Sequence, residues 1–538
     1  MLTPKYIFVT GGVVSSLGKG IISASIGKLL QARGYKVTIQ KFDPYINIDP
    51  GTLNPYEHGE CYVTEDGMET DLDLGHYERF TGIRTTRNNS ITTGRIYKTV
   101  IDRERHGDYL GKTIQVVPHI TDEIKRRMLR NNDDNEELDF IITEVGGTIG
   151  DIESAPFMEA IRQLRWELGH DAVNVHLTYV PYLKAAGELK TKPTQHSVKE
   201  MQSMGIQPDI LVLRTEQHLD DGLRRKVASF CNVDLECVVQ SEDMPSIYEV
   251  PVSMQRQGLD AAIMRKFGIP VGETPAMAPW HAFLEKQRNA TREVHVALVG
   301  KYDLQDAYKS IRESINLAGI YNNVRTKIHF VNSEEITQAN VAEKLYGMAG
   351  ILVCPGFGQR GIEGKIIAAE YSRTHDIPTF GICLGMQMMV IEFARNVLGY
   401  KDANSKEMDE ATPHAVIDIM EEQKANVHGG NMGGTMRLGA YDCLLREGSK
   451  SYAAYGTASV KERHRHRYEF NNAFEAEYEK NGMQCVGRNP ESDLVEIVEI
   501  PELKWYVGAQ FHPEYTSTVL RPHPLFMDFI KTLAEEQK

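Results

Sequence analysis

The sequence predicts an α/β protein of two domains, each built on a mostly parallel sheet. Between residues 6 and 240, short apolar runs typical of buried strands alternate with amphipathic segments of helix length. The alternation stops between residues 267 and 292, where prolines and then a polar stretch of helical character follow, and it resumes at Val294. Because strands that alternate with helices form parallel sheets, with ligands at the carboxyl ends of the strands, each half predicts its own sheet and site. We therefore expect domains at 1–267 and 293–538, joined by a linker at 268–292.

Composition limits the possible functions. The chain has 538 residues and a formal net charge of -14, with hydrophobic and charged contents of 41% and 25%, which are ordinary for a globular protein. The negative charge disfavours general nucleic-acid binding, which needs a surplus of Lys and Arg. Seven scattered cysteines favour a reducing cytosol over a disulfide framework, and we find no signal-peptide pattern and no membrane-spanning apolar run. We expect a cytoplasmic protein with no nucleic-acid or membrane partner.

The first strand and helix of the chain predict a phosphate-binding loop. A buried-strand pattern at residues 6–10 leads into a glycine-rich loop at 11–20 and an amphipathic helix at 21–33. In this arrangement backbone N–H groups and the helix dipole face an anion, and Lys19 neutralises it. The loop is one residue longer than the standard P-loop, and Gly20 stands where a Ser or Thr would bind Mg²⁺. The metal ligands must therefore come from elsewhere.

Carboxylates near two predicted strands are candidates for these ligands. Residues 70–76 place Asp71 and Asp73 two positions apart, so both side chains would point the same way in an extended segment. Glu144 directly follows the apolar strand pattern at 138–143. Hard oxygen ligands close to a triphosphate suit Mg²⁺, and we predict that Asp73 and Glu144 bind it.

A second anion site is predicted at residues 190–197. Lys190, Thr191 and Lys192 precede Pro193, a residue type favoured in the first turn of a helix. Two ammonium groups beside a helix N-terminus attract an anion. This site is distinct from the P-loop.

The second domain contains a candidate nucleophile in the run Gly381-Ile382-Cys383-Leu384-Gly385-Met386-Gln387. An apolar strand pattern precedes Cys383 and a helix follows it. This predicts a sharp elbow with the sulfur exposed at a helix N-terminus, where a thiolate is stabilised. His512 and Glu514 follow downstream, and Cys, His and Glu in this order form an acyl-transfer triad. The pairing resembles the class I glutamine amidotransferases, whose triad hydrolyses glutamine to release ammonia.

The turn at residues 354–361 offers backbone N–H groups for an oxyanion hole. Pro355 has no N–H, so we expect Gly356 and Leu384 to be the donors. Glu407 and a basic run at 463–469 lie between the nucleophile and His512. Inside an acidic domain, we expect the basic run to bind a substrate carboxylate or to form an interface rather than to bind nucleic acid.

Taken together, the whole chain resembles the CTP synthase family. The resemblance rests on residues 6–20, 43–51, 65–80, 190–197, 381–387 and 433–439. It implies a dethiobiotin-synthetase-like P-loop domain followed by a class I glutamine amidotransferase domain. In that family, ATP phosphorylates O4 of UTP, and ammonia from glutamine displaces the phosphate to give CTP. Because ammonia is nucleophilic only when unprotonated, we expect it to travel inside the protein.

The resemblance also assigns residues to ligands. The ATP site would comprise Ser16, Leu17, Gly18, Lys19, Gly20, Ile21, Asp73, Glu242, Asp243 and Met244. UTP, or CTP as product inhibitor, would contact Ser15, Asp151, Ile152, Glu153, Lys190, Thr191, Lys192, Pro193, Thr194, Gln195 and Lys226. Glutamine would be held by Gly356, Leu384, Gly385, Met386, Gln387, Glu407 and Arg467. Mg²⁺ as cofactor, activation by GTP and a homotetramer are implied in the same way.

Two other functions compete with this one. Another glutamine-dependent amidoligase, such as those that amidate corrinoid carboxylates, would share the P-loop and the glutaminase but would not explain the second anion site. A P-loop switch ATPase or scaffold with an inactive glutaminase-like domain would be favoured by loss of a triad residue, yet Cys383, His512 and Glu514 are all present. Formation of CTP from UTP, ATP, Mg²⁺ and glutamine distinguishes the three.

Overall fold

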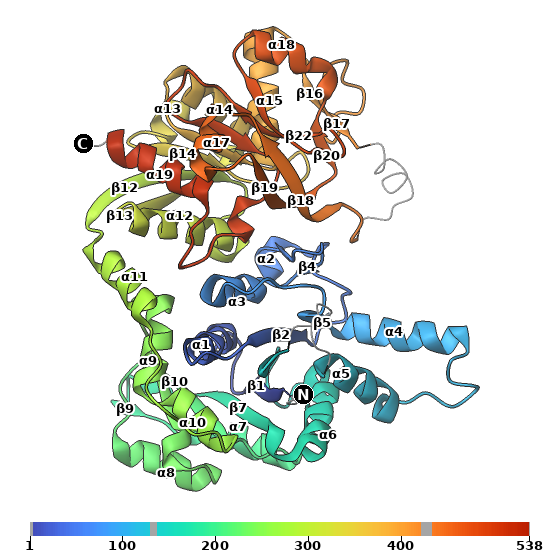
Figure 1. Cartoon of the computed structure of the whole chain (residues 1–538), viewed down its shortest axis with the longest axis vertical. Helices are drawn as coiled ribbons and strands as arrows, with labels where there is room; N and C mark the ends of the chain where they lie inside the picture. Colours follow the sequence, from blue (N-terminus) through green and yellow to red (C-terminus); the bar gives the residue numbers. More distant parts are fainter. Residues whose placement is uncertain (1–3, 130–136, 421–432, 537–538) are drawn as a thin grey trace. The chain divides into compact units, whose positions relative to one another are not determined.

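The structure is a computed structural model that describes residues 4–129, 137–420 and 433–536. It divides into two compact units. The first unit consists of Met1–Asp49 and Asp73–Ala278, and the second consists of Pro50–Leu72 and Pro279–Lys538 (Figure 1). The second unit therefore contains a segment from the N-terminal half of the sequence, which the sequence analysis did not foresee. None of the described helices is long and apolar enough to cross a lipid bilayer.

The first unit is built on a parallel sheet of seven described strands in the order β11-β10-β7-β1-β6-β2-β5. These strands are β1 (Lys5–Gly11), β2 (Val37–Asp43), β5 (Ser90–Thr92), β6 (Phe140–Val145), β7 (Ala172–Tyr179), β10 (Ile210–Thr215) and β11 (Val238–Glu242), and a hairpin of β8 (Tyr182–Leu183) and β9 (Glu188–Leu189) lies outside the sheet. The helices are α1 (Lys19–Ala32), α3 (Asp73–Thr81), α4 (Thr93–His106), α5 (Thr121–Met128), α6 (Ala155–Leu168), α7 (Lys192–Ser203), α8 (Asp221–Cys231), α9 (Val250–Arg256) and α10 (Leu259–Lys266).

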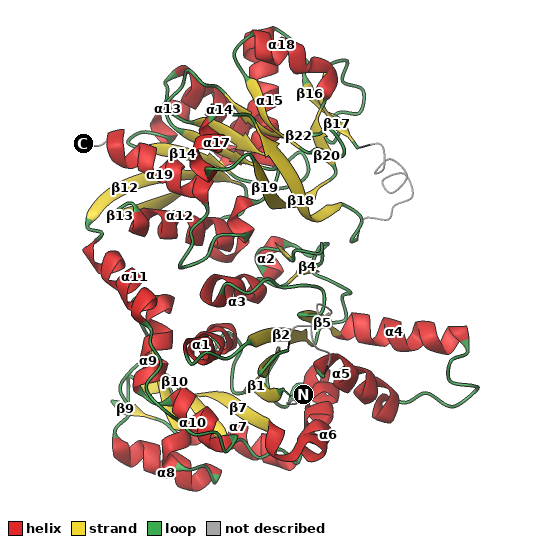
Figure 2. Cartoon of the chain, in the orientation of Figure 1, coloured by secondary structure: helices red, strands yellow, loops and turns green. Residues whose placement is uncertain are grey.

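Burial on both faces explains why the strands of the first unit are continuous apolar runs. α1 packs against α3, α9 and α10, α5 packs against α6, and Figure 2 shows helices on both sides of the strands. Every residue of β2 and β6 is buried. Phe8, Phe42, Ile141 and Phe157 belong to one apolar cluster of this core. A parallel sheet covered in this way requires apolar residues at successive positions, which is the pattern that predicted it.

The second unit contains a nine-stranded mixed sheet in the order β13-β12-β14-β15-β23-β22-β21-β18-β19, with parallel pairs from β13 to β23 and antiparallel pairs from β23 to β19. Its strands are β12 (Arg292–Gly300), β13 (Val324–Asn332), β14 (Gly350–Val353), β15 (Thr379–Ile382), β18 (Arg437–Leu445), β19 (Ser459–His466), β21 (Gln484–Arg488), β22 (Val495–Glu499) and β23 (Tyr506–Ala509). β16 (Asn404–Ser405), β17 (Ala415–Ile419) and β20 (Tyr468–Phe470) form a small sheet.

The helices of the second unit are α11 (Ala278–Asn289), which begins on the last residue of the first unit, α12 (Lys309–Tyr321), α13 (Val341–Lys344), α14 (Ile362–Thr374), α15 (Leu384–Phe393), α17 (Lys450–Tyr455), α18 (Glu475–Lys480) and α19 (Pro524–Glu536). Along β12, Val296 and Leu298 join the cluster that contains α12 and α19, whereas Ala297 and Val299 join a cluster on the opposite face. Two apolar layers therefore enclose this sheet.

Residues 50–72 are tied into the second unit by hydrogen bonds. They form α2 (Pro55–His58) and the hairpin of β3 (Tyr62–Val63) and β4 (Glu69–Thr70). The Glu60 carboxylate accepts a hydrogen bond of 2.7 Å from the backbone N–H of Ser310, at the start of α12. The Tyr62 hydroxyl donates to the carbonyl of Tyr515 at 2.7 Å. These contacts explain why the segment belongs to the second unit.

One local prediction is wrong. Residues 70–76 are not extended, because α3 begins at Asp73 and Asp71 precedes it in the other unit. The polar stretch before Arg292 is helical, as expected, and forms α11, which buries Trp280, Phe283 and Leu284. Three buried apolar side chains on one helix indicate that it packs as part of a core.

Candidate active sites

Cys383 lies on a strained elbow between β15 and α15. Its backbone has φ 52° and ψ -109°, a conformation that non-glycine residues rarely adopt. A Cβ on Gly381 would lie 2.3 Å from the Met389 sulfur, and a Cβ on Gly385 would lie 2.0 Å from the carbonyl oxygen of Val353. Only glycine fits on either side, which explains the glycines that identified this run in the sequence.

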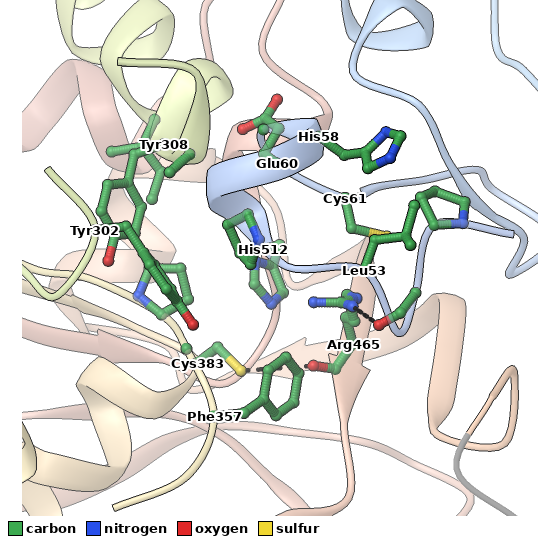
Figure 3. A pocket seen from close by; sticks show the side chains of 18 of the residues that line it. Leu53, His58, Glu60, Cys61, Tyr302, Tyr308, Phe357, Cys383, Arg465 and His512 are labelled. Carbon is green, nitrogen blue, oxygen red and sulfur yellow. Dashed lines mark hydrogen bonds between the residues drawn. The ribbon is translucent and has the colours of Figure 1, made fainter. Parts of the chain in front are cut away.

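The elbow faces a cavity of about 170 Å³ within the second unit. Gly356, Cys383 and His512 line it together, and residues 50–61 supply another part of its wall (Figure 3). Cys383 is only 2% exposed, so the prediction that its sulfur is exposed was wrong. Cys383 instead lines the cavity and is shielded from the outer surface of the protein.

The three residues predicted as a triad meet in this cavity. His512 Nδ1 and Glu514 Oε1 are 2.7 Å apart, and both side chains are buried. Burial by itself would lower the pKa of His512, but the Glu514 carboxylate and the charge of the nearby Cys383 raise it to about 10. The Cys383 thiol donates to the Arg465 carbonyl at 3.7 Å, and Gln510 Nε2 donates to the sulfur at 3.7 Å. The imidazole is thus held charged beside the thiol.

The predicted oxyanion turn keeps its place despite Pro355. The backbone N–H of Cys354 donates to the Val299 carbonyl at 3.0 Å, which joins the end of β14 to β12. Gly356 has φ +154°, a value that a side chain would disfavour, and it lines the Cys383 cavity. Leu384 is the first residue of α15, where backbone N–H groups have no helical acceptor. Gly356 therefore lies on the turn after β14 and lines the Cys383 cavity, and Leu384 lies at the elbow itself.

A second cavity of about 320 Å³ adjoins the first and contains Glu407 and Arg467. The two cavities share Phe357 and Arg465 in their walls. Burial raises the pKa of Glu407, while a 2.7 Å hydrogen bond from the Gly358 N–H lowers it. The other predicted glutamine contacts are buried on α15: Leu384, Gly385, Met386 and Gln387.

The P-loop of the first unit has the expected form. Gly18 precedes α1 in the left-handed conformation, with φ +90°, and Lys19 begins the helix. Lys19 Nζ donates to the Gly147 carbonyl at 2.8 Å. Burial lowers the pKa of Lys19, whereas the carboxylate of Glu144 raises it. The lysine is therefore held at the loop before any phosphate binds.

Asp73 occupies the space that a larger residue at position 20 would need. A Cβ on Gly20 would lie 2.2 Å from Asp73 Oδ1. Lys41 Nζ forms an ion pair with Asp73 and another with Glu144, the latter at 3.0 Å, so the two carboxylates converge on one point. β2 and β6 pair Lys41 with Glu144 in register. This convergence fits the predicted Mg²⁺ ligands, although no group of three or more His, Cys, Asp or Glu among the described residues is arranged to hold a metal.

A cavity of about 210 Å³ lies beside the P-loop in the first unit. Its lining includes Ser16, Leu17, Gly18, Ile21 and Met244, all predicted ATP contacts. The other two residues predicted near the adenine contact neighbouring side chains: Glu242 Oε1 lies 2.9 Å from His218 Nδ1, and Asp243 forms an ion pair with Arg214 at 2.6 Å. Arg214 itself lines the cavity and was not predicted.

The predicted UTP contacts lie on several surface segments of the first unit. Lys190 pairs with Glu188, and Thr191 precedes the first residue of α7. The ammonium of Lys192 lies 6.0 Å from the centre of the Phe230 ring on α8, the helix that carries the exposed Lys226. Ser15, Asp151, Ile152 and Glu153 are exposed, whereas Thr194 is buried and hydrogen-bonded to Thr178 at 2.9 Å.

Comparisons with known proteins match each half of the chain to a family. Residues 5–269 match the family described as CTP synthase N-terminus, and residues 303–532 match the class-I glutamine amidotransferase family. A CTP synthase of Bacteroides thetaiotaomicron is 72% identical over 538 residues, covering 99% of each chain. The chain belongs to the CTP synthase family. One from Porphyromonas gingivalis strain W83 is 63% identical, covering 100% of this chain and 99% of that one. Among solved structures, the glutaminase domain of Trypanosoma brucei CTPS with bound acivicin is 39% identical and covers 45% of this chain and 94% of that chain, with a TM-score of 0.42.

Membership of the CTP synthase family means that the chain is a glutamine-hydrolysing ligase that converts UTP to CTP. Three lysines around the candidate sites were not predicted. Lys41 bridges the two predicted metal ligands, and Lys301 and Lys365 contact the oxyanion turn. Lys41 and Lys301 lie at the ends of strand patterns, which was an available signal, whereas Lys365 lies within α14. Arg465, in the wall of both glutaminase-side cavities, belongs to the basic run that was expected to bind a substrate carboxylate or to form an interface.

Proposed function

We propose that Cys383, His512 and Glu514 release ammonia from glutamine. The Cys383 thiolate attacks the carboxamide carbon, and the C–N bond breaks as His512 protonates the departing nitrogen. Water then attacks the thioester, with His512 as base, giving glutamate and the free thiol. Glu514 holds the imidazole through its 2.7 Å contact to Nδ1. The assembly of these three side chains at one cavity is the observation that supports this proposal.

The surrounding residues would bind the charged ends of glutamine and the oxyanion. The backbone N–H groups of Gly356, on the turn after β14, and of Leu384, at the elbow, would stabilise the tetrahedral oxyanion. Glu407 and Arg467 line the adjoining cavity, where a carboxylate and a guanidinium complement an α-amino and an α-carboxylate group. Gln387 Nε2 donates to the Tyr468 carbonyl at 2.8 Å and would fix one wall of that cavity.

The first unit would activate UTP for attack by the ammonia. ATP would occupy the P-loop and the adjoining 210 Å³ cavity, with Lys19 on its phosphates. Asp73 and Glu144 would hold Mg²⁺, which when bound neutralises phosphate charge. UTP would lie on Lys190–Gln195, Lys226 and the segment around Asp151, so that its O4 accepts the γ-phosphoryl group and leaves as phosphate when ammonia attacks C4. The oxygen at C4 is a poor leaving group until it is phosphorylated.

Three further properties are proposed from family membership alone. GTP would activate the glutaminase, CTP would inhibit by occupying the UTP site, and the active form would be a homotetramer. Activation is measured as glutamine hydrolysis with and without GTP, and the assembly as a molar mass in solution.

An isotope experiment tests the central step. With [4-¹⁸O]UTP, ATP, Mg²⁺ and glutamine, the ¹⁸O should appear in inorganic phosphate in proportion to the CTP formed, because O4 leaves as part of the phosphate. CTP formation with ¹⁸O in water instead would contradict phosphorylation of UTP. No CTP from either glutamine or ammonium salt would contradict the function as a whole.

A further inference from the structure

Two buried lysines hold the turn that carries the oxyanion donor. Lys365 on α14 has no exposed surface, and its Nζ donates to the Cys354 carbonyl at 2.6 Å and towards the Pro355 carbonyl at 3.3 Å. Lys301 follows β12, is 4% exposed, and its Nζ donates to the carbonyl of Phe357. The two lysines therefore donate hydrogen bonds to three backbone carbonyls of the turn between β14 and α14.

The surroundings of Lys365 are unusual for a structural lysine. Among the described residues, no carboxylate lies within ion-pair distance of its Nζ, so two backbone carbonyls are its hydrogen-bond acceptors. Burial, together with the positive charge of Lys301, lowers the pKa of Lys365 to about 8, while Cys354 and Cys383 act in the opposite direction. Burying an ammonium group without a counter-ion costs free energy that an apolar side chain of the same length would not cost.

The geometry of a peptide unit connects Lys365 to the reaction. In a trans peptide the C=O and the following N–H lie in one plane and point in opposite directions. The carbonyl of Pro355 and the N–H of Gly356 belong to the same peptide unit. A lysine that holds this carbonyl on one side therefore directs the N–H to the other side, and its charge polarises the N–H as a donor. Gly356, with φ +154°, does not fix that plane by side-chain sterics.

We propose that Lys365 is a positioning residue for the oxyanion hole: it orients and polarises the Gly356 N–H through the Pro355 carbonyl. Lys301 acts on a different peptide unit. By holding the Phe357 carbonyl it directs the Gly358 N–H, which donates to Glu407 at 2.7 Å. Lys365 therefore affects the transition state, and Lys301 affects binding of the substrate. This inference rests on the proposed role of Gly356 in glutamine hydrolysis.

Substitution of Lys365 by Met tests the proposal, since Met keeps the length and removes the charge and the donors. Removal of an oxyanion donor costs about 10²–10³ in kcat, and a misdirected donor should cost less. We expect Lys365→Met to lower kcat for glutamine hydrolysis by about ten- to hundredfold with KM within about threefold. Synthesis of CTP from ammonium salt should be unchanged, which also shows that the variant is folded.

Inhibition measurements separate positioning from general damage to the site. The γ-aldehyde analogue of glutamine adds reversibly to the thiol and places an oxyanion in the hole, whereas glutamate does not. Lys365→Met should weaken the aldehyde by the same factor as kcat and leave glutamate unchanged. Lys301→Met is the matched buried control and should raise KM and weaken glutamate instead. Equal losses of aldehyde and glutamate affinity in Lys365→Met would overturn the proposal.

A second variant covers the case in which Lys365→Met does not fold. Lys365→Arg keeps a charged donor at the same carbonyls, so kcat and aldehyde affinity should stay within about threefold of wild type. A tenfold loss of both in a folded Arg variant would overturn the proposal. Cys383→Ala distinguishes this failure from failure of the proposed function. If Cys383→Ala still hydrolyses glutamine, the proposed triad is wrong. If Cys383→Ala is inactive but the Lys365 variants are normal, only the proposed role of Lys365 is contradicted.

Discussion

The two units place their chemistry on similar turns that are built in different ways. In both, a buried parallel strand ends in a glycine-containing turn and a helix begins: β1 leads to α1 and β15 leads to α15. In the first unit, a glycine adopts the left-handed conformation before the helix, and a lysine begins the helix. In the second, the residue in the strained conformation is Cys383 itself.

The difference reflects where the reactive group comes from. At the P-loop turn the reacting phosphates belong to the ligand, and the protein supplies charged side chains of both signs to bind it. Lys19 and Lys41 lie close to carboxylates there. Under the proposed function the elbow presents the reactive atom of the protein, so the strained conformation falls on Cys383, and glycines on both sides make room for it. A helix N-terminus suits an anion in both cases, whether a phosphate or a thiolate. The chemistry is set by the residue at the turn, not by the topology.

Removal of the nucleophile should give the largest effect and separates the two turns. Cys383→Ala should lower glutamine-dependent CTP synthesis by at least about 10³-fold, because a covalent nucleophile is lost. Synthesis from ammonium salt should remain and should increase with pH as more ammonia is unprotonated. His512→Ala should behave in the same way and Glu514→Ala should lose less. Loss of both activities in a folded Cys383→Ala would show that the two turns do not work separately.

Neutral substitutions of the two predicted metal ligands should give the opposite pattern. Asp73→Asn and Glu144→Gln should each lower CTP synthesis from either nitrogen source by about 10²-fold or more, because the carboxylates are the proposed Mg²⁺ ligands. Basal glutamine hydrolysis should persist. Asp43→Asn is a useful comparison, since Asp43 lies 3.7 Å from Lys41 but was not predicted as a ligand. Near-normal synthesis in both ligand variants at saturating Mg²⁺ would place the metal elsewhere.

The second anion site should discriminate between the two nucleotides. Lys190→Ala should raise the KM for UTP by about tenfold, as expected for loss of one charge-assisted contact, and should leave the KM for ATP within about threefold. Lys184, an exposed lysine six residues earlier, is a matched control, and its substitution by Ala should change neither KM. An effect on ATP alone would reverse the assignment of the two nucleotide sites.

Much of this organisation could be predicted from the sequence because short-range patterns determine it. Continuous apolar runs identified β1, β6 and β15, and the glycines around Lys19 and Cys383 identified the two turns. Each of these signals has a local cause, since a strand buried on both faces needs apolar residues and a crowded turn needs glycine. The resemblance to the CTP synthase family supplied the residue assignments that local patterns could not.

What the sequence did not reveal depends on contacts between distant residues. Nothing local in residues 50–72 indicates that Glu60 binds the start of α12 or that Tyr62 binds the Tyr515 carbonyl. The helix at Asp73 was missed because alternating Asp and Leu residues also suit an extended segment. Lys365 gave no signal, because its acceptors, the carbonyls of Cys354 and Pro355, become known only when the turn is built.

The smallest expected effect concerns pH and compares one histidine from each unit. His176 in the first unit contacts Thr10 Oγ1 at 2.9 Å and Ser197 Oγ at 2.8 Å, and its complete burial, with the charge of Lys19, lowers its pKa to about 3. His512 has its pKa raised to about 10 by Glu514 and Cys383 in spite of burial. The folded protein therefore favours the neutral form of His176 and the charged form of His512.

The two histidines should therefore affect stability in opposite ways: the contribution of His176 is lost as the pH falls, and that of His512 is lost as the pH rises. Unfolding lets His176 take up a proton below its ordinary pKa of about 6.5, so its contribution is present above that pH and is lost as the pH falls towards 3. The contribution of His512 is present below about 6.5 and is lost as the pH rises through 10. Between pH 7.5 and 6, His176 should cost about 0.8 kcal/mol of unfolding free energy.

In urea titrations, His176→Gln should be less stable than wild type at pH 7.5, because two buried hydroxyls lose their partner, yet it should lose less stability on acidification. Since both proteins share every other titrating group, the difference between their pH slopes isolates His176. An unchanged slope would mean that this histidine takes up its proton as readily in the folded protein as in the unfolded one.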